Sequence, residues 1–209
     1  MEIEEGNMDI KRKQDIKGRA KDINDRSEQF QMLHATYASQ EYVKLIVQDF
    51  YKEQLAKIKN EIKVRAERGL DTEKELERAR GLKELINQNR FVIHIGYMNI
   101  SDENMARVTK TGKVFYILLA QSLKDKIHKP DGRLDYGVVK KIRELMAHEL
   151  GHIVLHTKEI LAEDGTQGTL NIKTDDQEME ACLFAEELLE LRRERNRRIR
   201  EDGGADKLL

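Results

Sequence analysis

His148-Glu149-Leu150-Gly151-His152 is the stretch of sequence that decides the fold of the second half of this chain. The two histidines are four positions apart, so on a helix their imidazoles project from one face, one turn apart, and can reach the same metal ion. Glu149 directly follows the first histidine, where its carboxylate can accept a proton from a water molecule on that metal. We therefore expect a helix that carries two metal ligands and a general base.

The residues on both sides predict one amphipathic helix over about residues 135–156. Asp135 is a candidate N-cap, directly after the turn signal Pro130-Asp131-Gly132. The buried stripe recurs at spacings of three and four and includes both histidines: Val138, Ile142, Leu145, His148 and His152. A single histidine on such a stripe is more often a core residue bonded to the backbone. Two histidines with a glutamate between them favour a metal site.

A catalytic zinc site needs a third protein ligand and one position left open for water. In one known pattern a glycine and a third histidine follow at fixed spacing, but Leu155 and Lys158 occupy those positions and exclude it. The alternative is a glutamate from a following helix. The capping box Thr174-Asp175-Asp176-Gln177 predicts the start of such a helix, in which Glu178 and Glu180 are the candidate ligands.

The neighbours of these two glutamates favour Glu178. Its helix face continues with small and then large apolar residues, which let two helices approach closely: Ala181, Cys182, Ala185, Leu188 and Leu189. The face of Glu180 includes a further charge, Glu187. The alternative is that both glutamates only add negative charge to the start of the helix, where the helix dipole favours it.

Two blocks of this sequence resemble the ImmA/IrrE family of zinc metallopeptidases. The first is Ala147-His148-Glu149-Leu150-Gly151-His152-Ile153-Val154-Leu155-His156, and the second is Glu178-Met179-Glu180-Ala181-Cys182-Leu183-Phe184-Ala185-Glu186-Glu187-Leu188-Leu189. The second block resembles the family's E-x-E-A-x-x-F-A helix, in which the first glutamate is the ligand. The resemblance extends over roughly residues 91–191 and implies a zincin-like, gluzincin-type domain with a small sheet before the motif helix.

The resemblance also implies a function. The chain would be a zinc-dependent endopeptidase that cleaves a protein, typically a transcriptional repressor of a phage, a mobile element or a stress response. His148, His152 and Glu178 would hold Zn²⁺, and Glu149 would act as the catalytic base. The strand expected over residues 113–119 would align an extended substrate by pairing along its edge.

Some residues of the expected site depart from the family or stay open. Cys182 stands where the family often has asparagine, which weakens the hydrogen bond expected to a ligand histidine. The group that stabilises the oxyanion is not identified by the pattern. His128, His156 and Tyr136 are the candidates, and the sequence does not choose among them.

The first part of the chain is a different kind of sequence, rich in helical patterns. A weak heptad runs through Ile16, Ile23, Phe30 and Tyr37. A second helix is expected after Ser39 and an end at Gly69, and the capping box Thr72-Glu73-Lys74-Glu75 opens a third helix that packs back as a hairpin. We expect residues 1–90 to form a helical arm and hairpin that serve as an interaction module. Residues 91–209 would form the zincin-like metallopeptidase domain.

Between these parts the apolar period changes from helical to extended. Residues 91–97 and 113–119 are rich in branched and aromatic side chains and predict strands, and residues 105–108 predict a short third one. The fold class is therefore α+β, with the helical arm before a small sheet and the motif helix.

Composition limits the location and the partners. The net charge of −1 gives the whole chain no bias toward nucleic acid or membrane surfaces. The single cysteine precludes an intramolecular disulfide and fits a reducing cytoplasm, and the acidic N-terminus is unlike a secretory signal. The apolar run Val114-Ala120 is too short to span a membrane. We expect a cytoplasmic protein.

Two rival interpretations remain open. The arginine-rich run from Arg192 to Arg200 invites a nucleic-acid contact, but we favour a solvated helix end, because no aromatic residue is interleaved and acidic turns precede it. The other rival is a catalytically weak zincin-fold protein that acts through its N-terminal helices. Self-association through those helices is a further possibility.

Overall fold

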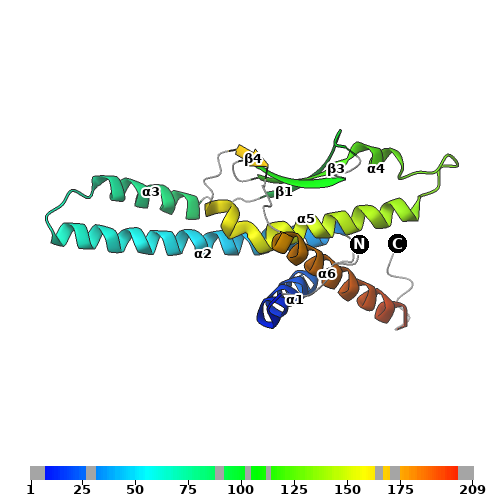
Figure 1. Cartoon of the computed structure of the whole chain (residues 1–209), viewed down its shortest axis with the longest axis horizontal. Coiled ribbons are helices and arrows are strands. Elements are labelled where there is room, and N and C mark those ends of the chain that lie inside the picture. Colours follow the sequence, from blue (N-terminus) through cyan, green and yellow to red (C-terminus); the bar gives the residue numbers. More distant parts are fainter. Residues whose placement is uncertain are drawn as a thin grey trace.

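The computed structural model describes residues 8–26, 32–87, 92–101, 105–111, 114–162, 167–169 and 175–201. These ranges contain six helices and four strands (Figure 1): α1 (Ile10–Arg26), α2 (Met32–Glu67), α3 (Glu73–Asn87), β1 (Val92–Met98), β2 (Ala106–Thr111), β3 (Val114–Ala120), α4 (Gln121–Asp125), α5 (Tyr136–Ala162), β4 (Gln167–Thr169) and α6 (Asp175–Glu201). The predicted α+β class is confirmed. The expected strands and helices are present, and most of their bounds shift by a few residues, whereas the second helix begins well before the predicted start.

The four strands form one mixed sheet in the order β1-β3-β2-β4. Strand β3 pairs parallel with β1 and antiparallel with β2, and β2 pairs antiparallel with β4. Because β3 is hydrogen-bonded on both sides, it offers no free edge. The expectation that residues 113–119 align a substrate by edge pairing is therefore wrong: a strand's sequence does not reveal its place in the sheet.

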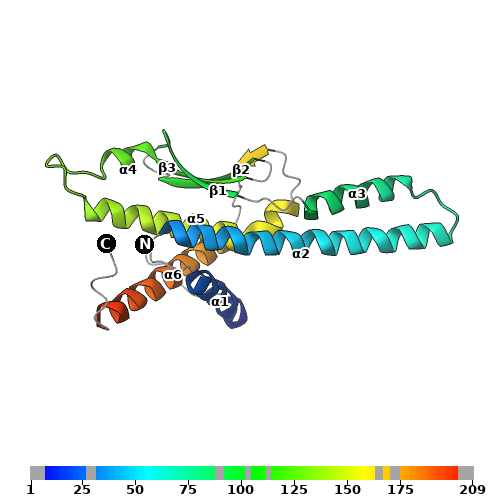
Figure 2. The same ribbon diagram turned by 180° about the vertical axis from the view of Figure 1, so that it is seen from behind.

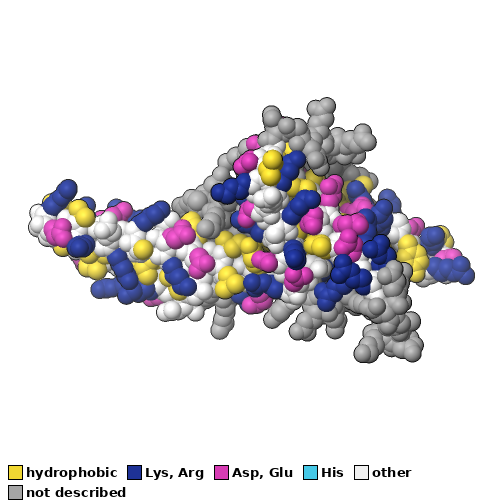
Figure 3. Space-filling model, turned by 90° about the horizontal axis from the view of Figure 1, so that it is seen from below, with side chains coloured by type: hydrophobic (Ala, Val, Ile, Leu, Met, Phe, Trp, Pro, Cys, Tyr) yellow, Lys and Arg dark blue, Asp and Glu magenta, His cyan; other side chains and the backbone are white. Residues whose placement is uncertain are grey.

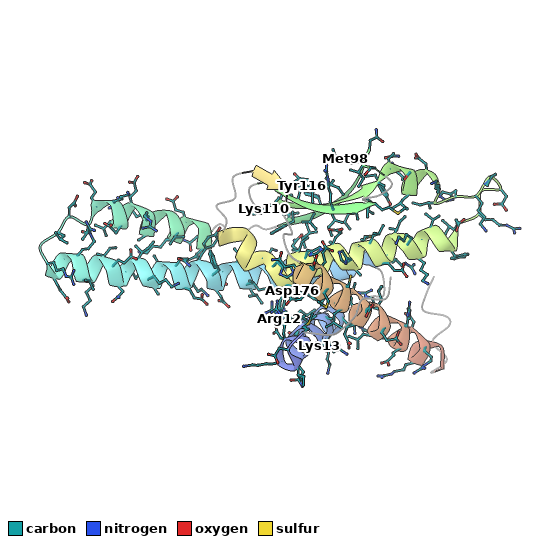
Figure 4. The ribbon with its side chains drawn as sticks, in the orientation of Figure 1. Arg12, Lys13, Met98, Lys110, Tyr116 and Asp176 are labelled. Atoms are coloured by element: carbon teal, nitrogen blue, oxygen red, sulfur yellow. The ribbon has the colours of Figure 1, made fainter. Side chains whose placement is uncertain are left out.

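One face of the sheet packs on helices and contributes to the core. Phe115, Ile117 and Leu119 of β3 alternate along the strand and are wholly buried. Residues of the other face, such as Tyr116 and the 43 % exposed Met98, point away from the helices (Figure 4). The sheet lies on one side of α5 and the adjoining part of α2, and α1 and α6 lie on the opposite side (Figures 1 and 2).

The second and third helices form the expected hairpin, which projects beyond the sheet (Figure 1). The predicted end at Gly69 is confirmed: its φ is +67°, its N–H donates to the carbonyl of Ala66 at 3.0 Å, and the N–H of Leu70 donates to Arg65 at 3.0 Å. This pair of bonds satisfies carbonyls that the last turn leaves open. The hairpin therefore reverses direction through a backbone conformation that favours glycine.

The start of the second helix was predicted incorrectly. It begins at Met32 rather than after Ser39, and Ser39 lies wholly buried within it. A serine is a good helix cap only where the chain enters the helix, and here close packing inside the molecule overrides that local preference. Ile16 and Ile23 of the predicted heptad are buried in α1, whereas Phe30 lies outside the described residues.

The core crosses the boundary that we expected near residue 90. A single cluster of buried apolar residues includes members from both sides of it: Ile16, Ala20, Ile23, Val43 and Val47 before, and Phe115, Ile117, Leu150, Ile153, Phe184 and Leu188 after. Helices α1 and α2 thus share one core with the sheet, α5 and α6. The role of residues 1–90 as an interaction module stays a prediction. None of the described helices is both long and apolar enough to cross a membrane.

Candidate metal centre

Helix α5 carries the histidines, and its start is as predicted. The carboxylate of Asp135 accepts the N–H groups of Gly137 at 2.9 Å and Val138 at 3.2 Å, which are two of the donors that the first helical turn leaves open. Gly132 adopts a φ of +79° in the turn ahead of it. The cap sets where the helix begins and hence which residues face the sheet and α6.

Gly151, inside the motif, is where α6 crosses α5. A Cβ atom added at this position would lie 3.0 Å from the carbonyl oxygen of Ala181, 3.1 Å from its Cα, and 3.2 Å from the ring of Phe184. Ala181 is itself wholly buried. Two small residues thus let the helix backbones approach closely, which brings the first turn of α6 over the histidines.

The structure brings together the three residues expected as ligands. The Nε2 atoms of His148 and His152 are 3.0 Å apart, and carboxylate oxygens of Glu178 lie 3.1 Å from the first and 3.7 Å from the second. One donor atom from each residue lies within 4.8 Å of the others, so the group could hold a metal ion. Glu180 turns elsewhere, toward Arg12 and His156.

These separations suit a tetrahedral ion. Zinc bonds of about 2.0–2.1 Å at tetrahedral angles place neighbouring donors roughly 3.3 Å apart. The two Nε2 atoms are 3.0 Å apart, one Glu178 oxygen lies 3.1 Å from His148 and the other oxygen lies 3.7 Å from His152, so the donors are spaced on the scale of a single ion. Two imidazoles and one carboxylate are also a donor set that zinc commonly takes. The residues therefore fit zinc, although the identity of the metal stays a prediction.

Glu149 lies buried next to this group, only 5 % exposed. Burial, and then the nearby Glu178 carboxylate, raises the pKa of Glu149 to about 8, while a hydrogen bond from the backbone N–H of Val108 opposes the rise. A cation held by the three ligands would act in the same direction as that hydrogen bond, because it favours the charged carboxylate. The site can therefore hold or release a proton at this carboxylate near neutral pH.

The two histidines that we expect as ligands have pKa values that favour the neutral imidazole. Burial, with smaller contributions from His148 and His156, lowers the pKa of His152 to about 3. Burial also lowers the pKa of His148, although Glu178 opposes it. A neutral imidazole is the form that binds a metal, so little proton release is needed at either ring.

Cys182 occupies the position from which a partner of a ligand histidine was expected. Its Sγ atom lies 3.5 Å from Nδ1 of His148, and burial, then Glu178 and Glu186, raises the pKa of the thiol. A neutral sulfur accepts hydrogen bonds weakly, so it holds the ring less firmly than an amide oxygen would. The Nδ1 atom of His152 is buried and bonds to none of the residues that the structure describes.

The three candidates for the oxyanion occupy different places: Tyr136 and His128 lie at or before the start of α5, whereas the ring of His156 lies next to that of His152, with centroids 5.8 Å apart. Tyr136 is 78 % exposed at the start of α5, twelve positions and about 18 Å of helix before His148. His128 is exposed in the preceding loop, where its Nδ1 lies 3.3 Å from the carbonyl of Gly132. His156 is buried and faces Glu180 at 3.8 Å. The group that stabilises the oxyanion therefore stays a prediction.

The arginine-rich run is mixed: Arg192 is buried, whereas Arg193, Arg197 and Arg198 are exposed on the surface of α6. Arg192 is 5 % exposed, and burial, then Arg195 and Arg143, lowers its pKa to about 10. Farther along, Arg193 lies 3.2 Å from Glu190 and Arg198 lies 3.7 Å from Glu194. Seen from below, basic and acidic side chains alternate over the described surface, with apolar side chains between them (Figure 3).

Sequence reasoning missed two residues next to the site. Val108 of β2 donates its backbone N–H to Glu149, and Arg12 of α1 holds Glu180 through two contacts of 2.6 Å. Arg12 and Glu180 are 168 positions apart. No pattern in a single sequence links two such distant positions.

Comparison with known proteins adds no support for the expected metal ligands and catalytic base. The chain matches no family model, and no curated protein or solved structure is significantly similar to it. The resemblance to ImmA/IrrE metallopeptidases therefore depends on the two short blocks that carry His148, Glu149, His152 and Glu178.

Proposed function

We propose that the chain is a zinc-dependent endopeptidase of the ImmA/IrrE type that hydrolyses a peptide bond in a protein substrate. The observation that carries this proposal is the convergence of His148, His152 and Glu178 within 4.8 Å, with the buried carboxylate of Glu149 directly beside them. A purely structural cluster would not need a neutral pair of imidazoles, a facing carboxylate and a second carboxylate poised to titrate.

The chemistry follows from the roles that these residues can take. Zinc, when bound by the three ligands, supplies a Lewis acid that activates water for attack on a peptide carbonyl. Glu149 accepts the proton of the attacking water and delivers it to the departing amine. The N–H of Val108 holds the Glu149 carboxylate in place during this transfer. The carboxylate of Glu149 thus begins and ends the cycle in the same state.

The strand next to the site is β2, and we assign to β2 the substrate-aligning role that we had expected of β3. The carbonyl of Met105 accepts the N–H of Ala120 of β3, so odd-numbered backbone groups of β2 face β3 and even-numbered ones, such as the N–H of Val108, face outward. Outward pairing with β4 is limited to residues 109–111 among the parts of the chain that the structure describes. Because Glu149 already accepts the N–H of Val108, an extended substrate can pair with the other outward groups, the N–H and carbonyl of Ala106 and the carbonyl of Val108.

The substrate that we propose is a transcriptional repressor, as in the family that the chain resembles. The α2–α3 hairpin supports selection of a whole protein rather than of a short peptide. It projects beyond the sheet and exposes apolar side chains that a partner can cover, namely Val64, Leu70 and Leu76. Recognition would lie on this hairpin and hydrolysis at the metal centre.

The metal can be tested before any substrate is known. Purified full-length protein should carry one zinc per chain by elemental analysis, and His148→Ala or Glu178→Ala should lose most of it. Glu149→Gln should retain zinc and fold, because it changes only the proton acceptor. Absence of stoichiometric metal from carefully loaded protein would refute the metal centre.

Hydrolysis is tested with the parent and Glu149→Gln side by side. Both proteins, loaded with zinc, are incubated with a peptide library made from a digested proteome and with a candidate repressor encoded nearby, and new termini are identified by mass spectrometry. We expect cuts by the parent that fall about a hundredfold or more in Glu149→Gln, the usual cost of losing a general base. Equal cutting by the two proteins would remove Glu149 from the mechanism.

The projecting hairpin also favours a second candidate, an interaction protein in which the zincin-like half serves as a scaffold. This candidate predicts that the parent and Glu149→Gln capture the same protein with the same affinity, and that the parent leaves that protein intact over hours. Cleavage of the captured protein by the parent alone would exclude it.

A further inference from the structure

Helix α1 is docked along α6 by contacts that hydrolysis at the metal centre does not by itself require. Three polar contacts join the two helices in order: Arg12 to Glu180 at 2.6 Å, Lys17 to Glu187 at 3.4 Å, and the side chain of Arg195 to the carbonyl of Asn24 at 3.3 Å. The paired positions advance in the same direction along both helices. Between them, α1 buries the wholly inaccessible Ile16, Ala20 and Ile23.

The contact between Arg12 and Glu180 has the strongest geometry of the three. Nε of Arg12 lies 2.6 Å from one carboxylate oxygen and Nη2 lies 2.6 Å from the other, so the pair is bidentate. The Glu180 side chain is 14 % exposed, and the remaining arginine nitrogen lies 3.2 Å from Asp15. A bidentate pair fixes the direction of the carboxylate as well as its distance. Figure 4 shows Arg12 beside the first turn of α6, where Asp176 is labelled.

Glu180 is two positions after the expected ligand Glu178. At about 100° per residue, the two side chains leave α6 roughly 200° apart, on nearly opposite sides of the helix. Glu178 therefore reaches His148 and His152, whereas Glu180 reaches Arg12 and, at 3.8 Å, His156. A rotation of this first turn about the helix axis would displace both carboxylates together.

We infer that Arg12 is a positioning residue for the metal centre: by fixing Glu180, it sets the rotation of the first turn of α6 and so the place of Glu178. The inference rests on the proposed metal site. It gives α1, which lies more than a hundred positions before the ligands in sequence, control over the metal affinity. The Arg12 side chain would not contact the metal or the reacting atoms and would act only through Glu180.

The test compares Arg12→Ala and Arg12→Lys with Lys17→Ala in the full-length protein. Lys17 is a matched control, because it joins the same two helices two turns farther from the ligands. We expect Arg12→Ala to weaken zinc binding, measured by competition with a chromophoric chelator, by about 10- to 100-fold, as for other groups that orient a ligand. Lys17→Ala should change it less than threefold. Arg12→Lys keeps the positive charge but cannot make the bidentate contact, so its zinc affinity should lie between those of Arg12→Ala and Lys17→Ala.

A readout without metal separates this inference from the proposed function. Hydrogen–deuterium exchange of metal-free protein should speed up in residues 175–184 for Arg12→Ala, but not for Lys17→Ala. If the parent binds no zinc, the metal centre fails, and the exchange comparison still decides whether Arg12 orders this turn. The inference is overturned if Arg12→Ala lowers the melting temperature while zinc affinity and exchange of residues 175–184 match those of Lys17→Ala.

Discussion

Replacing Gly151 by alanine tests whether the close crossing of α5 and α6 builds the metal centre. In an open helix, glycine to alanine stabilises a protein by up to about 1 kcal/mol, because alanine loses less backbone entropy on folding. At Gly151 the new Cβ would stand 3.0 Å from the carbonyl oxygen of Ala181, whereas ordinary contact begins at 3.4 Å. The neighbour is backbone and cannot rotate away, so α6 must retreat by several tenths of an ångström.

Two costs follow from that retreat. Overpacking of a well-packed core typically costs about 1–3 kcal/mol, which offsets the gain in helix propensity and makes the net change destabilising by up to about 2 kcal/mol. Ala181 is three positions from Glu178, so the carboxylate shifts as well. Metal–ligand distances tolerate only about 0.2 Å, and we expect zinc affinity to fall at least about tenfold.

Gly81→Ala is the matched control, since Gly81 lies within α3 and its added Cβ would meet nothing within 4 Å. Thermal unfolding and zinc competition should show Gly81→Ala with a melting temperature raised by a few degrees and unchanged zinc affinity. Gly151→Ala should show a lowered or unchanged melting temperature and weaker zinc binding. If Gly151→Ala gains stability as Gly81→Ala does and binds zinc as tightly as the parent, the close crossing does not shape the site.

Three further predictions concern the hairpin, pH and the thiol. A chain starting at Asn89 should be insoluble or metal-free, because it lacks the core residues of α1 and α2. Replacement of residues 59–81 by a short glycine linker should instead retain zinc and abolish only cleavage of the natural protein substrate. Normal cleavage of that substrate by the shortened protein would show that the hairpin does not select it. With metal removed by a chelator, the free energy of unfolding measured in urea should fall by up to about 2 kcal/mol as pH rises from 6.5 to 8. The reason is that the folded state retains a proton on Glu149 that the unfolded state has released. Glu149→Gln should abolish this pH dependence, and a pH dependence of opposite sign in the parent would contradict the raised pKa. Below pH 6.5 the lowered pKa of His152 acts in the opposite sense, since the unfolded state then binds the additional proton, so the test is confined to the upper window. Cys182→Ala should weaken zinc binding about tenfold and Cys182→Asn should restore or strengthen it, as competition titrations would show; equal affinity for all three proteins would mean that the contact with His148 does not orient the ring.

Local patterns were sufficient for most of the elements. The cap at Asp135, the helix end at Gly69 and the β3 strand follow from short-range chemistry, in which a carboxylate accepts open N–H groups, glycine adopts a positive φ, and branched residues favour extended backbone. The predicted start of α2 was wrong because serine is common at helix starts, and the sequence does not show that Ser39 is buried inside the helix by tertiary packing.

The sequence by itself determined that the candidate ligands and base lie close together on one helix. Helical spacing alone puts His148 and His152 on one face and Glu149 in the same turn, independently of the packing of other elements. The tertiary structure decided which distant residues complete the site. The crossing at Gly151 selects Glu178 over the neighbouring Glu180, the strand order places β2 rather than β3 beside Glu149, and α1 brings Arg12 to the far side of α6. These outcomes depend on packing between elements far apart in the chain, and a periodic pattern within one element contains no information about its neighbours in space.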